Sequence, residues 1–497
     1  MNNCKICISL AATSADHLLD QLSRAEAAAD IIEIRFDFLA QAQIEKALLC
    51  LPKIANQYLF TYRPKADGGA RELSLRERQD FWRGIRKRSF EFEFLVDLEP
   101  DIIDLLDFPA GQIILSSHNF DGPCDAKAVF GELKNVHAGV IKMAEKIVDI
   151  TDAIELFQLL VNVDRGQLVP IAMGEVGKWT RILGPAHGAP IAYTSLDADN
   201  ETAPGQISAT DMLELFRVKA LDENTEVYGV IAGDTSHSLS PYMHNPAFHS
   251  INLNAVFVPL QVADLDDFIT RMVKPETRKI ELNFKGFSVT NPHKRAVMRH
   301  LDHIDGVART IGAVNTLKIA HGKIEGYNTD ADGFIEPLIN RFGTLKDARV
   351  AVTGAGGAAR ACIYALSQKG CQVTVFARDV LRAASLREDF GVAVVELKGG
   401  FDDFDIVVNT TPLGTKGEYE AKTIAVAEQL NGVKLVYDLN YNPSETRLVR
   451  EAKMAGVPAI GGLEMLIAQG AKQFELWTGR KAPEEVMMSA VRNRLGI

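Results

Sequence analysis

Eight short apolar runs recur through the first 217 residues, and most intervals between them carry helix-like sequence. The runs are Cys4–Leu10, Ile31–Phe38, Tyr58–Tyr62, Phe94–Leu98, Gln112–Ser116, Val140–Met143, Leu168–Met173 and Ile191–Ser195. Ser14–Ala29 and Thr151–Val161 are two of the expected helices. Strands that alternate with helices form a parallel sheet, and eight such units close into a (β/α)8 barrel. The sequence therefore predicts an α/β TIM barrel over residues 1–217.

Polar side chains gather where these runs end, which is where barrels of this kind place their chemistry. Lys142 lies inside the sixth run, and His118 follows the fifth. Burial lowers the pKa of an amine, and an uncharged amine can attack a ketone to form an imine. His118 could then remove a proton from the carbon next to the iminium. The alternatives are a salt-bridged strand lysine and an ordinary core histidine.

Residues 1–217 resemble type I 3-dehydroquinate dehydratase. The motifs that carry the resemblance are E-x-R at 33–35, Arg63 with D-G-G at 67–69, S-S-H-N at 116–119, V-I-K-M-A at 140–144, M-G-E-x-G at 173–177 with Arg181, and A-P-G-Q at 203–206. The family usually has Glu where Asp67 stands, and its bacterial members have Ser where Thr202 stands.

The resemblance implies a Schiff base between Lys142 and the substrate ketone, with His118 as the acid/base. 3-Dehydroquinate would lose water to give 3-dehydroshikimate. It further implies that Arg181 binds the substrate carboxylate, while the remaining residues bind ring hydroxyls, orient the catalytic pair or line the substrate; these are Glu33, Arg35, Arg63, Asp67, Thr202 and Gln206.

A strand, a glycine turn and a helix follow one another at residues 349–366. This order is typical of a dinucleotide site, because the backbone must approach a pyrophosphate and the helix N-terminus favours the anion. The next strand, Gln372–Ala377, ends in Arg378, which suits a 2′-phosphate and favours NADP; Arg382 and Arg360 support this interpretation. Asp379 weakens it, because an acid at this strand end suits NAD.

Upstream of this glycine turn, Lys294 follows the strand-like run G-F-S-V at 286–289, where a helix is expected to begin. Asp330 ends the polar run G-Y-N-T-D at 326–330. A lysine and an aspartate from different strands can shuttle a proton to a carbinol oxygen during hydride transfer. Taken singly, Lys294 is equally consistent with a solvent-exposed helix lysine, and Asp330 with a turn aspartate.

Residues 226–497 resemble shikimate dehydrogenase. The motifs are S-L-S-P at 238–241, S-V-T-N-P-H-K at 288–294, G-A-V-N-T at 312–316, N-T-D at 328–330, G-A-G-G-A-A-R at 354–360, A-R-D-x-x-R at 377–382, N-T-T-P-L-G at 409–414, Y-D-L-N-Y at 437–441 and G-G-L-E-M-L-I-A-Q at 461–469.

This second resemblance implies a catalytic pair, Lys294 and Asp330, and two sets of binding residues. The shikimate set is Ser238, Ser240, Thr290, Asn315, Thr329, Tyr441, Gln469 and Gln473. The NADP set is Gly354, Ala355, Gly356, Gly357, Ala358, Arg378, Arg382 and Thr410. The product of the first half would be the substrate of the second.

We therefore predict a dehydratase barrel at 1–217, a shikimate-binding domain at 224–340 completed by helices within 462–497, and a Rossmann NADP domain at 341–461. Residues 211–224 are expected to form a closing helix and a short linker. The net charge of −11 argues against a general nucleic-acid or acidic-membrane binder. Cys4 and Cys7 lack a second pair and suggest strand residues, so no metal site is expected.

Two other functions stay open from the sequence. The second half could prefer quinate and NAD, or the chain could sense metabolites without turnover. A cytoplasmic protein is expected, or one of the plastid stroma if a transit peptide has been removed.

Overall fold

The computed structural model describes residues 2–197 and 201–497, and it divides the chain into two compact units. One unit contains Met1–Val227, Asp234–His237 and Asn254–Phe284, and the other contains Tyr228–Gly233, Ser238–Leu253 and Lys285–Ile497. No helix within the described ranges is long and apolar enough to cross a membrane.

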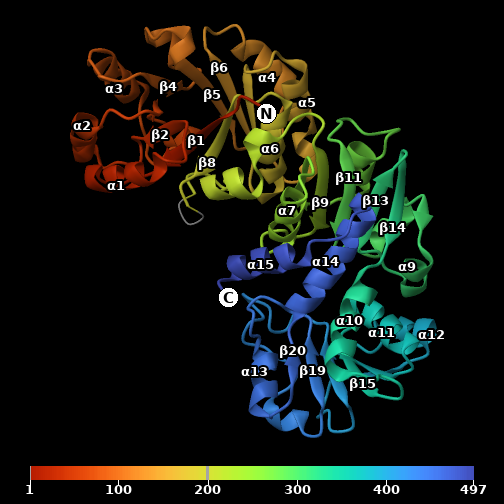
Figure 1. The fold of residues 1–497 in the computed structure, drawn as a ribbon. Helices are drawn as coiled ribbons and strands as arrows, with labels where there is room; N and C mark the ends of the chain where they lie inside the picture. Colours follow the sequence, from red (N-terminus) through yellow and green to blue (C-terminus); the bar gives the residue numbers. More distant parts are fainter. Residues whose placement is uncertain (1, 198–200) are drawn as a thin grey trace. The chain divides into compact units, whose positions relative to one another are not determined.

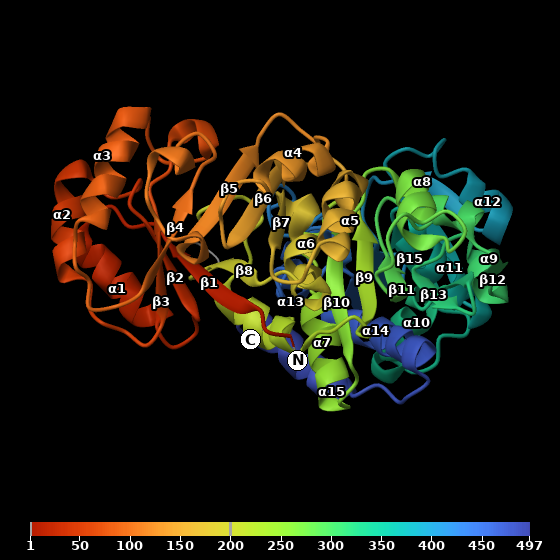
Figure 2. The same cartoon turned by 90° about the horizontal axis from the view of Figure 1, so that it is seen from above.

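The first eight strands form a nearly closed parallel barrel, drawn from red to yellow in Figures 1 and 2. They are β1 (Lys5–Leu10), β2 (Ile31–Arg35), β3 (Gln57–Thr61), β4 (Phe94–Leu98), β5 (Ile113–Asn119), β6 (Val140–Lys146), β7 (Leu168–Met173) and β8 (Ile191–Ser195). The order is β7-β6-β5-β4-β3-β2-β1-β8. The predicted barrel is confirmed.

Helices follow most of these strands. They are α1 (Ala15–Ala25), α2 (Gln41–Cys50), α3 (Leu75–Arg86), α4 (Ala126–Leu133), α5 (Ile154–Asn162) and α6 (Lys178–Leu183). Ser14 and Ser74 begin α1 and α3 by accepting hydrogen bonds from backbone N–H groups of the first turn. Residues 211–224 are expected from the sequence to form a closing helix followed by a short linker, but the helical part is broken. It consists of a π-helical turn (Asp211–Leu215) and a 3₁₀ turn (Val218–Ala220), and Arg217 between them has φ +49°.

Alternation along each strand divides the barrel interior into layers. Apolar inward side chains from seven strands pack together as one buried cluster, which includes Cys7, Ile31, Leu59, Ile114 and Val169. Two residues further along β2, β3 and β5, the same inner face carries Glu33, Thr61 and Ser116. The apolar layer therefore supports a polar layer toward the carboxyl ends of the strands.

The second half contains two six-stranded sheets. The mixed sheet has the order β10-β9-β11-β13-β14-β12, from β9 (Glu226–Ala232), β10 (Ala255–Gln261), β11 (Phe284–Val289), β12 (His303–Ile304), β13 (Thr316–Ala320) and β14 (Lys323–Tyr327). Its helices are α7 (Ser240–Ser250), α8 (Leu265–Phe268) and α9 (Gly306–Ile311). After Lys294 the chain forms turns and a 3₁₀ segment (Ala296–His300) where the sequence suggested a helix start.

The other sheet is parallel and has the order β17-β16-β15-β18-β19-β20. Its strands are β15 (Arg349–Thr353), β16 (Gln372–Ala377), β17 (Ala393–Glu396), β18 (Ile406–Asn409), β19 (Leu435–Asp438) and β20 (Ala459–Ile460). The helices are α10 (Asp330–Phe342), α11 (Gly357–Gln368), α12 (Ser385–Phe390), α13 (Arg447–Met454), α14 (Gly462–Thr478) and α15 (Glu484–Leu495). This is the predicted dinucleotide fold, because strand order reverses at β15, between β16 and β18.

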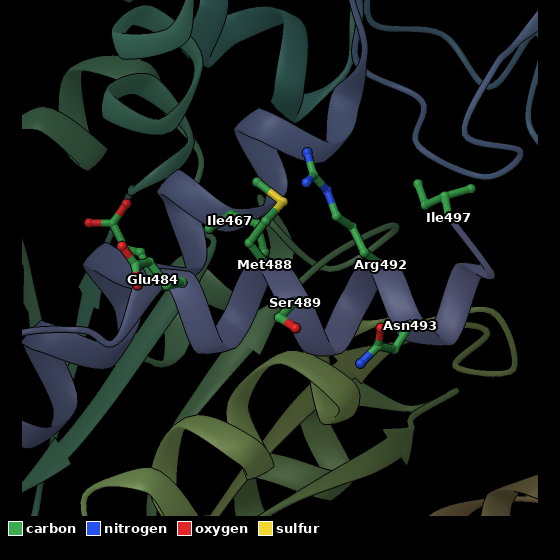
Figure 3. A pocket seen from close by; sticks show the side chains of 8 residues that line it. Ile467, Glu484, Met488, Ser489, Arg492, Asn493 and Ile497 are labelled. Atoms are coloured by element: carbon green, nitrogen blue, oxygen red, sulfur yellow. The ribbon is translucent and has the colours of Figure 1, made fainter.

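An open groove of about 460 Å³ lies along α15 and beside Ile467 in the first half of α14 (Figure 3). Its lining includes Ile467, Met488, Arg492 and Ile497, and it contains none of the residues that the sequence assigns to a site.

Candidate active sites

Lys142 is buried inside the barrel, with 3% of its surface exposed. Its ammonium nitrogen donates to Asp97 Oδ2 at 2.9 Å, and the ring of Tyr193 lies 4.4 Å from that nitrogen. The register pairs Lys142 with Ser116 on β5 and Val169 on β7, so the lysine points inward with the polar layer. Burial lowers the pKa of the amine, and the charge of Asp97 opposes that shift only in part.

Asp97 on β4 connects the lysine to its surroundings. It is fully buried and accepts hydrogen bonds from Arg63, Ser116 and Lys142. Burial alone would raise the pKa of this carboxyl, but the charges of Arg63, Lys142 and His118 outweigh burial and hold its pKa below the usual range. Asp97 therefore remains an anion beside an amine that loses its proton more easily than usual.

His118 lies on the same inner face, one strand away from Lys142. Burial lowers its pKa well below the ordinary value, and the charges of Arg63 and Lys142 add to this effect. Its Nδ1 atom is buried without a hydrogen-bond partner in the described part of the chain. A neutral imidazole with a free ring nitrogen can accept a proton from a substrate carbon.

The predicted polar residues of the second and third strands are held by neighbours. Glu33 accepts from Ser9 and from Thr61 at 2.7 Å. Arg35 is clamped by both carboxylate oxygens of Asp37, at 2.9 and 2.7 Å. These bonds fix the side chains before a substrate arrives, as preorganisation requires.

Arg181 on α6 is buried, and burial lowers the pKa of its guanidinium to about 10. Its Nε has no hydrogen-bond partner among residues 2–197 and 201–497. A buried guanidinium with an unused donor suits a carboxylate ligand. In the loop after β8, Thr202 donates to Gln206 Oε1 through its amide at 2.7 Å and its hydroxyl at 3.0 Å. Asp67 is half-buried, and burial raises its pKa.

In the second half, Lys294 donates to Asp330 at the start of α10. The other carboxylate oxygen of Asp330 accepts from Asn315 at 2.8 Å. Asn315 also donates to Thr329 at 2.9 Å. The structure therefore brings four predicted residues together: Lys294, Asp330, Asn315 and Thr329.

Two predicted glutamines of α14 join this group. Gln473 donates to the carbonyl of Asn315 at 3.2 Å and accepts from Ser288 at 2.7 Å, while Gln469 accepts from Asn315 at 3.4 Å. Ser238 accepts from the amide of Ser240 at 3.3 Å, where α7 begins. Thr290 is exposed just after β11, and Tyr441 is half-buried.

The glycine turn after β15 has the shape of a dinucleotide cradle. Gly354 has φ +109°, and a Cβ there would lie 2.5 Å from Thr410 Oγ1. A Cβ on Gly356 would meet no atom within 4 Å, so there is open space beside the start of α11. A Cβ on Gly357 would lie 3.1 Å from Lys294 Cδ, which places the cradle next to the Lys294–Asp330 pair. Ala355 and Ala358 complete this turn, and the residues present fit a pyrophosphate.

The strand end after β16 supports a 2′-phosphate site. Arg378 and Arg382 are exposed, and neither guanidinium has a hydrogen bond or ion pair in the ranges that the structure describes. Asp379 accepts from the amide of Arg382 at 3.0 Å, so its carboxylate caps a turn. The supporting role suggested for Arg360 is wrong, because this buried arginine turns back to Asp389 and to the carbonyl of Ile311.

Sequence reasoning missed Asp97, Tyr193 and Asp438. Asp438 is buried at the end of β19 and accepts four hydrogen bonds, from Asn409, Thr446 and both nitrogens of Asn440. Burial raises its pKa to about 6. Asn409 and Asn440 in turn hold the carbonyl of Leu413, so the loop that carries Thr410 is braced by this carboxylate.

Models of known families match the chain in four segments. A type I 3-dehydroquinase model matches residues 6–223, and a shikimate dehydrogenase substrate binding domain matches 230–317. A shikimate/quinate 5-dehydrogenase model matches 338–430, and a shikimate 5′-dehydrogenase C-terminal domain matches 462–492.

Individual proteins give the same result. The bifunctional 3-dehydroquinate dehydratase/shikimate dehydrogenase of Arabidopsis thaliana chloroplasts is 32% identical over 510 residues, covering 97% of this chain and 83% of the plant protein. An NADP(+) shikimate dehydrogenase of Methanopyrus kandleri is 40% identical over 56% of this chain and 98% of its own. A shikimate dehydrogenase structure in complex with NADP+ superposes with a TM-score of 0.51, at 38% identity, over 55% of this chain and 96% of its own.

The barrel with its buried lysine and the NADP-type Rossmann unit define a fused lyase and oxidoreductase. The chain belongs to the family of bifunctional 3-dehydroquinate dehydratase/shikimate dehydrogenases.

We expect Asp97→Asn to lower dehydratase kcat/KM by about 100-fold or more, because breaking a buried charge pair costs about 3–5 kcal/mol and leaves Lys142 without its anion and Arg63 with Glu99 alone. Steady-state assays of both activities would measure this, with shikimate dehydrogenase activity unchanged. Asp101→Asn is the matched control, because Asp101 is half exposed and pairs with Arg78 instead. Asp97→Asn with parental dehydratase activity would contradict the assignment.

Proposed function

We propose that this chain dehydrates 3-dehydroquinate at Lys142 and His118, and reduces the resulting 3-dehydroshikimate with NADPH at Lys294 and Asp330. The observation that carries the first activity is the buried Lys142–Asp97 pair beside an unpartnered imidazole nitrogen. The corresponding domains are 1–217 for the dehydratase, 224–340 with 462–497 for shikimate binding, and 341–461 for NADP.

In the barrel, the Lys142 amine adds to the substrate ketone, and water leaves to give a protonated imine. The positive nitrogen draws electrons from the neighbouring C–H bond, so neutral His118 can take that proton. The same imidazole, now protonated, returns the proton to the departing hydroxyl. Hydrolysis of the imine then releases the enone and frees the amine.

Arg181 fits the substrate carboxylate because its buried Nε has no other acceptor in the described chain. Glu33, Arg35 and Arg63 are fixed by neighbouring side chains and suit the ring hydroxyls or the orientation of Lys142. Gln206, Thr202 and Asp67 lie on the loops after β8 and β3 and suit contacts with the bound ring.

In the second half, the Lys294–Asp330 pair holds a proton for the oxygen of the substrate. Bound NADPH supplies the hydride. Asn315 fixes the Asp330 carboxylate, and Thr329 and Gln469 contact Asn315 in turn. Ser238, Ser240, Thr290, Tyr441 and Gln473 suit the shikimate carboxylate and hydroxyls. Gly354–Ala358, Thr410, Arg378 and Arg382 suit the cofactor.

Borohydride reduction tests the first activity. Incubation of the protein with 3-dehydroquinate and borohydride should attach a reduced ring to the Lys142 peptide, because an imine is reduced to a stable amine. Peptide mass spectrometry would detect it. Lys146→Ala, which removes the exposed lysine at the end of β6, should keep the adduct, whereas Lys142→Ala should lose it. An unmodified Lys142 peptide in the parent protein would count against the mechanism.

Cofactor kinetics test the second activity. Arg378→Ala should raise the KM for NADP at least tenfold and leave the KM for NAD within about twofold, because the guanidinium meets a phosphate that NAD lacks. Arg450→Ala, an exposed arginine on α13, is the control and should change neither constant. Equal use of NADP and NAD by the parent protein would overturn the cofactor assignment.

A further inference from the structure

The ring of Tyr193 lies against the amine that the proposed function makes reactive. Tyr193 is on β8, is 5% exposed, and has its ring centroid 4.4 Å from Lys142 Nζ. The negative face of an aromatic ring attracts a cation within about 6 Å, most strongly where water is excluded. Both side chains are buried, so water does not weaken this contact.

The hydroxyl of Tyr193 does not explain its position. This oxygen is buried without a hydrogen-bond partner in the described residues. Buried tyrosine hydroxyls usually have a hydrogen-bond partner, and a buried hydroxyl without a partner costs free energy. The ring, and not the hydroxyl, is therefore the part of Tyr193 that contacts a functional atom, Lys142 Nζ.

The chemistry at Lys142 makes a lasting cation. When the amine adds to a ketone and water leaves, one proton is taken up, and the nitrogen carries a positive charge with a single N–H. Asp97, at 2.9 Å, can accept that one N–H in the plane of the iminium. The faces of the iminium have no second carboxylate within hydrogen-bonding distance among the described partners of Lys142, and an aromatic ring is a neighbour that stabilises charge without removing the proton.

We propose that the ring of Tyr193 stabilises the iminium on Lys142 through a cation–π contact, which makes Tyr193 a catalytic residue of the dehydratase. This rests on the proposed Schiff base at Lys142. The other charged and titratable groups that act on this amine are Asp97, Arg63, Glu33, His118 and Cys7, and none of them is altered in the variants below.

Comparison of Tyr193→Phe with Tyr193→Leu separates the ring from the hydroxyl. Tyr193→Phe keeps the ring and should retain dehydratase kcat within about threefold. Tyr193→Leu keeps an apolar side chain without a ring and should lose about 5- to 30-fold in kcat, the equivalent of one cation–π contact. Tyr193→Leu should also lower the pKa of the free Lys142 ammonium, because the ammonium loses the same stabilisation. The acid limb of the kcat/KM profile should therefore shift to lower pH. Shikimate dehydrogenase activity of the same chain reports correct folding of the second half in each variant.

Equal loss in Tyr193→Phe and Tyr193→Leu would assign the role to the hydroxyl, and full activity in Tyr193→Leu would assign none; either result overturns the proposal. If Tyr193→Leu fails to fold, phenylalanines with one to five ring fluorines at position 193 keep the shape and progressively weaken the negative face. Dehydratase kcat should then fall stepwise with fluorine number, and a flat series would overturn the proposal.

Borohydride trapping distinguishes this inference from the proposed function. No adduct on Lys142 in the parent protein would mean that the Schiff base itself is wrong. An adduct that forms at the parental rate in every ring variant would refute only the role of Tyr193.

Discussion

The first active site depends on one carboxylate in the right place. A primary amine inside a barrel would simply lose its charge to burial, and Arg63 nearby would push its pKa lower still. Asp97 opposes both effects in part, since it is buried, ionised and bonded to Lys142, Arg63 and Ser116 at once. The amine is therefore held in one position and is still able to become neutral, which is what a nucleophile needs.

The second half uses the same two residue types differently. Lys294 and Asp330 also form an ion pair, but its lysine lies against the glycine turn and its aspartate is tied to Asn315. In the proposed function, a ketone that meets this pair receives a proton on oxygen, whereas a ketone that meets Lys142 is attacked at carbon. The difference comes from the neighbours: an apolar layer and an aromatic ring surround Lys142, while a polar chain of Asn315, Thr329 and Gln473 surrounds the other pair.

Much of the fold and of both sites could be predicted from the sequence, because each motif and each apolar run lies within one short segment. Strands β4, β7, β8 and β16 begin and end at the predicted residues, since buried parallel strands are unbroken apolar runs. Asp97 was missed because its partnership with Lys142 depends on register across three strands. Arg360 was misassigned because a long side chain on the cofactor helix can turn inward to Asp389, and no local pattern records which way it turns. The end of the helical turn at Leu215 was not predicted, because the amino-acid composition of residues 211–224 gives no signal for it.

The central claim is that Lys142 bonds covalently to the substrate while Arg181 holds its carboxylate. A crystal structure of the protein frozen after brief exposure to 3-dehydroquinate would test it most directly. The account predicts continuous electron density from Lys142 Nζ to a ring carbon, with the carboxylate on Arg181. A ring bound without a link to Lys142, or with its carboxylate turned away from Arg181, would contradict it.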